Sequence, residues 1–363
     1  MGPVMTSTQN VSTVQAAFLT LRRDFFGSKF GGLMTVLLLA ILVYIAWKAL
    51  DWTILRAVWA AEDAEMCKLE GSGACWSVIA ARWRLIMFGL YPYDEHWRSA
   101  LGCIAVVITV VLSCIPWFWS ARKLAAVWLL GYGSFYVLMQ GGLFGLSSVS
   151  IDQWGGLALT VFVFASVAVV GMPLAIILLL MRRSEMPIIS KTTGVIIDVV
   201  RSLPLLTIMF AAAVVLPFVI PSWMHGDKLY RVIIGFALFF ACYQAEILRG
   251  GVQAVAIGQE EAAKALGLSY WHRISRIVLP QAFRAALPPT INQFVVTFKD
   301  TSIITIIGFF EILASGAAAF GSAQWSFAYV EVYVFIGLIY FSFVFCLSRY
   351  GAYLERRHAI ATR

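Results

Sequence analysis

Long apolar runs alternate with short polar segments along most of the chain. Eight of the runs have about the length, near 20 residues, that a helix needs to cross the core of a bilayer. They lie at residues 31–50, 100–119, 124–146, 157–181, 193–220, 229–248, 289–313 and 329–348. Pro204 and Pro217 interrupt the fifth run, and such breaks persist at membrane depth only where the freed backbone packs on protein or lines a cavity. The pattern predicts an all-α integral membrane protein with about eight transmembrane helices.

The composition excludes an ordinary soluble domain. Hydrophobic residues make up 61% of the chain and charged residues 13%, and the mean hydropathy is +0.85. The net charge of +8 is compatible with nucleic-acid binding, so the positions of the charges decide whether such a partner is expected. With an even number of spans both termini lie on one side, and the loops on that side carry most of the Lys and Arg. The positive-inside rule makes that side cytoplasmic, and charge along one membrane face argues against a nucleic-acid partner.

One sizeable polar insert, residues 51–98, falls on the opposite side of the membrane, which is the periplasm in a Gram-negative cell. Cys67 and Cys75 are the only two of the six cysteines on that oxidising side. We therefore expect a disulfide between them, with two reduced cysteines as the alternative. The insert shows no enzymatic constellation, and a packing or docking role is expected for it.

Motifs for catalysis and for cofactors are missing from the sequence. No Cys/His spacing suggests a metal site, and no Gly-x-x-x-x-Gly-Lys-Ser/Thr phosphate loop occurs. We expect no catalytic residue, no metal and no cofactor in this chain, and no ATP hydrolysis by the usual phosphate-loop route.

The polar segment at 249–290 has the signals of two helices joined by a tight turn. Residues 259–266 are rich in Glu, Ala, Lys and Leu, which favour helix, and Gly267 stands where a left-handed residue would end it. Ser269 is placed to cap a second helix, and Pro280 is expected to stop that helix. A short amphipathic helix with an Ala-rich face suits insertion into a groove of another protein.

This segment contains Glu261-Ala262-Ala263, then Gly267, then Ile277-x-Leu-Pro280 after nine further residues. The pattern resembles the cytoplasmic coupling loop of permease subunits of ABC importers. Further motifs are similar to the polar and general L-amino-acid branch of that family; they lie at 201–204, 243–251, 280–282 and 299–302. Ser202 departs from the pattern, because relatives often carry Gly there. The resemblance covers residues 155–353, and the segments at 51–52, 82–84 and 97–98 resemble the extended N-terminal part of general L-amino-acid permeases.

The resemblance implies a type I ABC importer transmembrane domain in the bacterial inner membrane, with both termini cytoplasmic. A five-helix permease core at 155–353, containing the coupling loop 249–290, would follow a three-helix extension at 31–154, with an N-terminal arm at 1–30 and a tail at 354–363. Implied partners are a second, distinct permease subunit, a cytoplasmic ATPase dimer that binds ATP and Mg, and a periplasmic amino-acid-binding protein. The residues expected to contact the ATPase are Glu260, Glu261, Ala262, Ala263, Leu266 and Gly267.

Several polar residues fall within or at the edge of the apolar runs. Gln293, Thr297 and Asp300 are spaced i, i+4, i+7 and share one helical face, which makes them a candidate substrate path. The alternative is structural, with Asp300 paired to a neighbouring helix. Glu246 and Arg249, three residues apart, are expected to form an ion pair, and Arg201 is expected to bind carbonyls exposed near Pro204.

Two other functions compete with that of an ATP-driven importer of L-amino acids. An ion-gradient-driven secondary transporter would need inverted repeats and ion ligands at the membrane midplane, whereas the chain shows one unrepeated core. A membrane receptor that uses residues 51–98 as its sensor would leave the coupling loop unexplained.

Overall fold

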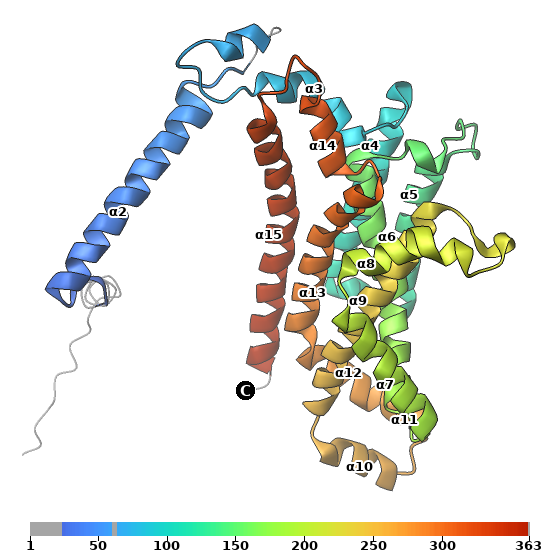
Figure 1. Ribbon diagram of the computed structural model, residues 1–363. Helices are drawn as coiled ribbons and strands as arrows, with labels where there is room; N and C mark the ends of the chain where they lie inside the picture. Colours follow the sequence, from blue (N-terminus) through green and yellow to red (C-terminus); the bar gives the residue numbers. More distant parts are fainter. Residues whose placement is uncertain (1–23, 60–63, 362–363) are drawn as a thin grey trace, which may run out of the picture. The chain divides into compact units, whose positions relative to one another are not determined.

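The computed structural model describes residues 24–59 and 64–361, and the described chain is helical without a named strand (Figure 1). Most of the N-terminal arm expected at 1–30, and the last two residues of the tail, lie outside the described residues. The chain divides into two compact units, Met1–Ala80 and Ala81–Arg363.

In the first unit, α2 (Lys29–Leu50) is an apolar helix whose side chains are exposed in this unit. The hydroxyl of Ser28 caps it by accepting from the N–H of Gly31 at 3.0 Å. The polar insert begins with a π turn at Asp51–Leu55 and contains a 3-10 turn at Ala64–Lys68. Cys67 and Cys75 are joined by a disulfide with 5.5 Å between their Cα atoms. The disulfide therefore closes residues 67–75 of the insert into a small covalent loop.

The helix α3 (Ser77–Phe88) leads into the second unit, where α4 (His96–Cys114) and α5 (Ala121–Gln140) pack against each other. A methyl group at Gly131 would overlap Thr109 across this contact, so the small residue permits the close approach. α6 (Gly156–Arg182) and α9 (Lys228–Gln253) make the most extensive helix pair of the unit. Buried aromatic side chains fill the space beside α6; they are Phe135, Trp154 and Phe162.

The fifth apolar run is bent, as its prolines predicted. α7 (Pro187–Ser202) meets the segment Leu205–Phe218 at 105°, with Pro204 at the break. That second segment comprises α8 (Leu205–Phe210), a π turn and a 3-10 turn that contains Pro217. The missing N–H and fixed φ of Pro204 explain why the helix cannot continue.

The second, third and seventh runs differ from the predicted ranges. α4 ends at Cys114, before Pro116, and does not reach residue 119. α5 ends at Gln140, because Gly141 adopts a φ of 68°, and does not reach residue 146. The seventh run is not one helix over 289–313: α13 (Leu287–Asp300) passes into a 3-10 segment at Thr301–Ile307, and Gly308 has a φ of 94°. A new helix, α14 (Ile312–Phe320), follows. Apolar composition alone does not show such an internal break.

Within the described residues, five helices are long and apolar enough to cross a membrane, or up to six if the bent pair at Pro204 counts as one span. The count of eight therefore stays a prediction. α15 (Tyr329–Ala361) is the longest helix and continues beyond the predicted end of the core into the expected tail. In Figure 1, α15 ends at the same end of its unit as α7, α10, α11 and α12.

Candidate functional site

The predicted turn of the polar segment is present as a complete helix C-cap. α10 (Ile257–Ala265) is followed by its C-cap residue, Leu266, and then by Gly267, whose φ of 73° lies in the left-handed region. The N–H of Gly267 donates to the carbonyl of Lys264 at 3.0 Å, and the N–H of Leu268 donates to that of Ala263 at 3.1 Å. These two bonds form a Schellman motif, so the end of α10 is set by the backbone itself.

The second helix does not stop at Pro280, and that prediction is wrong. The chain stays helical through α11 (Tyr270–Arg273), a π turn at Ile274–Val278 and α12 (Leu279–Ala285). Pro280 is the second residue of α12, directly after the π turn, where the i→i−4 hydrogen-bond pattern is already interrupted, so the proline is tolerated within the helical run. Ser269 occupies the N-cap position, but its hydroxyl bonds to Nδ1 of His272 at 2.7 Å instead of to the backbone.

The two faces of α10 differ. Ala263 is 2% exposed, and α10 packs against the π turn at Ile274–Val278. Away from this contact, Glu261 and Ala262 are exposed, and the C-cap residue Leu266 is 80% exposed. Other large apolar side chains of the segment are also exposed; they are Ile257, Leu268, Tyr270 and Trp271. Large apolar side chains exposed on a polar segment are typical of a protein-interaction surface.

Glu260 differs from its neighbour Glu261. Its carboxylate accepts from Nη2 of Arg183 at 3.0 Å. Arg183 is the C-cap residue of α6, where the helix dipole favours a cation. Of the six residues predicted to contact an ATPase, Glu260 and Ala263 therefore face their own chain, whereas Glu261, Ala262, Leu266 and Gly267 lie on the exposed side.

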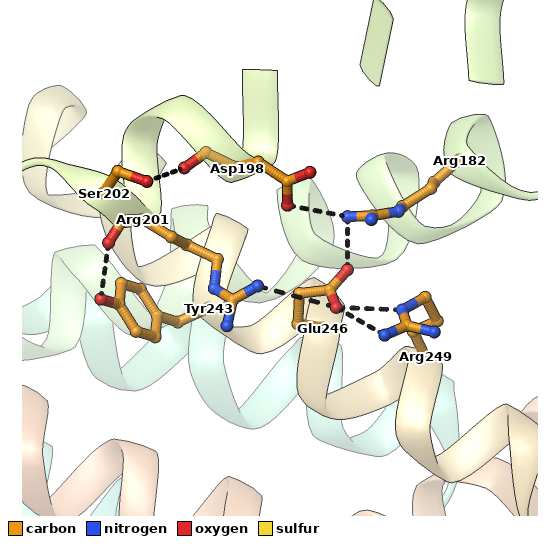
Figure 2. Close-up of polar contacts among 7 residues, drawn as sticks. All are labelled: Arg182, Asp198, Arg201, Ser202, Tyr243, Glu246 and Arg249. Atoms are coloured by element: carbon orange, nitrogen blue, oxygen red, sulfur yellow. Dashed lines mark hydrogen bonds and ion pairs between the residues drawn. The ribbon is translucent and has the colours of Figure 1, made fainter. Parts of the chain in front are cut away.

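Arginines from three helices surround the carboxylate of Glu246 on α9 (Figure 2). Arg182 of α6 lies at 2.5 Å, Arg249 of α9 at 2.9 Å and Arg201 of α7 at 3.7 Å. Arg182 also lies 3.6 Å from the carboxylate of Asp198. The predicted Glu246–Arg249 pair is confirmed, and it belongs to a larger ion cluster that joins α6, α7 and α9.

Arg201 does not bind carbonyls near Pro204 in the described part of the chain, so that prediction is wrong. Its guanidinium lies 5.2 Å from the centroid of the Tyr243 ring and takes part in the ion cluster. The Tyr243 hydroxyl donates to the carbonyl of Arg201 at 3.1 Å, also shown in Figure 2. α9 thus holds Arg201 at two points: Glu246 contacts its side chain, and Tyr243 contacts its backbone carbonyl.

Gln293, Thr297 and Asp300 all lie on α13, with Asp300 as its last residue. Thr297 is buried and its hydroxyl donates to the carbonyl of Gln293 at 2.8 Å, so that donor is already used. Gln293 and Asp300 are partly buried. No Lys or Arg nitrogen of the described chain lies within 4.0 Å of the Asp300 carboxylate. The alternative ion pair to a neighbouring helix is absent there.

Two buried polar groups were missed by sequence reasoning. Glu311 is fully buried and caps α14, accepting from the N–H of Leu313 at 2.7 Å and from the hydroxyls of Thr305 and Thr160 at 2.5 and 3.2 Å. Gln244 donates to the hydroxyl of Thr290 at 2.8 Å, joining α9 to α13. An acidic residue directly before a run of helix-forming small residues was the available signal for Glu311.

The described residues contain no group of three or more His, Cys, Asp or Glu side chains placed to hold a metal ion.

Residues 169–359 match the family model described as binding-protein-dependent transport system inner membrane component. The inner membrane amino-acid ABC transporter permease protein YhdY of Escherichia coli K12 is 37% identical, over 94% of this chain and 93% of the relative. The glutamate/glutamine/aspartate/asparagine transport system permease protein BztC of Rhodobacter capsulatus is 32% identical, over 93% and 92%. A crystal structure of an amino acid ABC transporter with histidines covers 56% of this chain and 92% of that chain, at 28% identity and a TM-score of 0.49.

The chain belongs to this family of inner membrane transport components, and it is a multi-pass ABC transporter permease.

Proposed function

We propose that the chain is the transmembrane subunit of an ATP-driven importer that takes up L-amino acids, of several side-chain types, from the periplasm. The names of YhdY and BztC, similar over more than nine tenths of this chain, support the amino-acid substrate. The observation that carries the proposal is α10: a short helix with a backbone-defined end, exposed at one end of the unit. Such a helix is suited to insertion into a groove of a partner.

The partner at this surface is a cytoplasmic ATPase dimer, which binds ATP and Mg and supplies the free energy. Glu261 forms hydrogen bonds with the rim of the ATPase groove, and Ala262 and Leu266 fill its apolar floor. When the ATPase subunits close on ATP, α10 moves as one piece, because backbone hydrogen bonds fix its C-terminal end. The permease subunits then rock from an inward-open to an outward-open arrangement, which is a two-state change biased by nucleotide.

A second permease subunit, similar but distinct, completes the pathway, and a periplasmic binding protein delivers the amino acid. The α10 end of the unit is cytoplasmic, with both termini on that side. The basic residues at this end support the orientation; they include Arg182, Arg183, Lys191, Arg273, Arg276 and Arg284. The insert at 51–98, which contains the Cys67–Cys75 disulfide, then lies on the oxidising side of the membrane.

The substrate passes along α13. Asp300 offers a carboxylate, without a basic partner in the described chain, to the ammonium group of an amino acid, and Gln293 offers a neutral amide. Thr297 contributes an acceptor at most, since its proton is used within the helix. A single acid does not select for basic side chains, which suits broad L-amino-acid uptake.

Affinity purification of the chain with its native neighbours, followed by mass spectrometry of the subunits, tests the assembly. The proposal expects an ATPase, a paralogous permease and, with substrate, an amino-acid-binding protein. Purification of the chain as a stable transporter without any ATPase would contradict it.

A further inference from the structure

Glu260 and Glu261, two adjacent acids of α10, lie in different surroundings. Glu260 pairs with Arg183 at 3.0 Å, and the two side chains are 37% and 25% exposed. Glu261 is exposed and makes no ion pair within the described chain. Neighbouring helical positions point about 100° apart, so one acid faces the membrane-spanning helices and the other faces away.

α10 has few attachments to the rest of its unit. Short segments join it to α9 and α11, and its buried face packs on the π turn at Ile274–Val278. Among the described residues, the Arg183–Glu260 pair is the one ion pair or side-chain hydrogen bond that α10 makes outside itself. This pair connects α10 directly to the end of α6, a helix of membrane length.

Arg182, the residue before Arg183, extends the connection from α6 to α7 and α9. Arg182 pairs with Glu246 on α9 at 2.5 Å and lies near Asp198 on α7 (Figure 2). Two consecutive arginines at the end of α6 thus bind the coupling helix with one side chain and the helix bundle with the other. A displacement of α10 is passed to α6 through the first pair and shared with α7 and α9 through the second.

We propose that Arg183 and Glu260 transmit the movement of the coupling helix to the membrane helices, whereas Glu261 makes the contact with the ATPase. The two acids then have separate tasks: attachment to the ATPase depends on Glu261, and the conversion of attachment into transport depends on Glu260. This inference rests on the proposed ATP-driven function. It also changes the sequence-based interpretation, in which both glutamates contact the ATPase.

The test uses the whole transporter, with its native ATPase, second permease and binding protein, in proteoliposomes. Variants Arg183→Gln, Glu260→Gln, Glu261→Gln and the exchange Arg183→Glu with Glu260→Arg are compared with wild type. Arg276→Gln and Glu185→Gln are matched controls, because both residues are exposed and unpaired in the described chain. The readouts are ATPase co-purification and the amino acid taken up per ATP hydrolysed.

Arg183→Gln and Glu260→Gln are expected to retain the ATPase but to lower uptake per ATP by about fivefold, the upper effect of one partly exposed ion pair. The exchange should recover part of the loss, since it restores the pair but places an acid at the end of α6. Glu261→Gln should instead reduce ATPase co-purification, and both controls should behave as wild type.

Unchanged uptake per ATP in the two single variants overturns the inference, as does an exchange no better than either of them. Loss of the ATPase from Glu260→Gln also overturns it, because Glu260 would then be an ATPase contact. A wild-type transporter that takes up no amino acid with ATP contradicts the proposed function itself, whatever the variants do.

Discussion

Arg182 and Glu246 form an ion pair of 2.5 Å between residues 64 positions apart, joining the end of α6 to α9. The same carboxylate serves Arg201 and Arg249, so one acid neutralises cations from three helices. Glu246 is 12% exposed, whereas Asp198, the other acid of the cluster, is 61% exposed. The stability of this end of the bundle therefore depends on Glu246 far more than on Asp198.

Glu246→Gln is expected to destabilise the protein by about 2 kcal/mol, below the range for fully buried pairs because the arginines are partly exposed. The loss has a simple cause: three guanidinium groups remain close together without their shared anion. Thermal unfolding in detergent should show a lower midpoint for Glu246→Gln and little change for Asp198→Asn. Equal effects of the two variants would contradict this assignment.

Gly267 is predicted to be needed for its backbone conformation alone. A Cβ there would meet nothing within 4 Å, but its φ of 73° is strained for other residues by about 1–2 kcal/mol. Gly267→Val should loosen the end of α10 and reduce ATPase co-purification, whereas Gly267→Asn, which tolerates this region better, should stay near wild type. A valine variant that binds the ATPase normally would show that the turn is dispensable.

The Cys67–Cys75 disulfide is predicted to form in cells, because the insert faces an oxidising compartment. Closing a loop with a sequence separation of 8 stabilises it by about 2.5 kcal/mol in the chain-entropy model. Mass spectrometry of unreduced protein should find the two peptides linked, and a membrane-impermeant maleimide should label both cysteines only after reduction. Labelling of both cysteines in intact cells without reduction would show that they are free thiols and would contradict the prediction.

Asp300→Asn tests the substrate path on α13. Loss of one charge-assisted hydrogen bond to the substrate ammonium should lower uptake about tenfold, with assembly and basal ATP hydrolysis unchanged. Glu185→Gln is the matched control, since it removes one exposed acid outside α13. Unchanged uptake with the same amino-acid profile, or a complex that falls apart, would make Asp300 a structural residue.

Local chemistry allowed part of this structure to be predicted. The Gly267 turn follows from a glycine after a run of helix formers, and the Glu246–Arg249 pair follows from i, i+3 spacing. The bend at Pro204 follows from the missing N–H of proline. Each of these depends on residues within one turn of each other.

The remaining features depend on distant parts of the chain. The Arg182–Glu246 pair requires α6 and α9 to pack side by side, which no local pattern specifies. A helix end expected at Pro280 is wrong because composition does not reveal the π turn before it. The different orientations of Glu260 and Glu261 become visible only once Arg183 is placed beside α10.

The most direct test of the account is uptake by the complete transporter in proteoliposomes without any ion gradient. With Mg-ATP on the ATPase side and the loaded binding protein on the other, labelled L-amino acids should accumulate, and ionophores should not prevent it. A non-hydrolysable ATP analogue should give no accumulation. Accumulation that needs a sodium or proton gradient and proceeds without ATP would contradict the account and identify a secondary transporter.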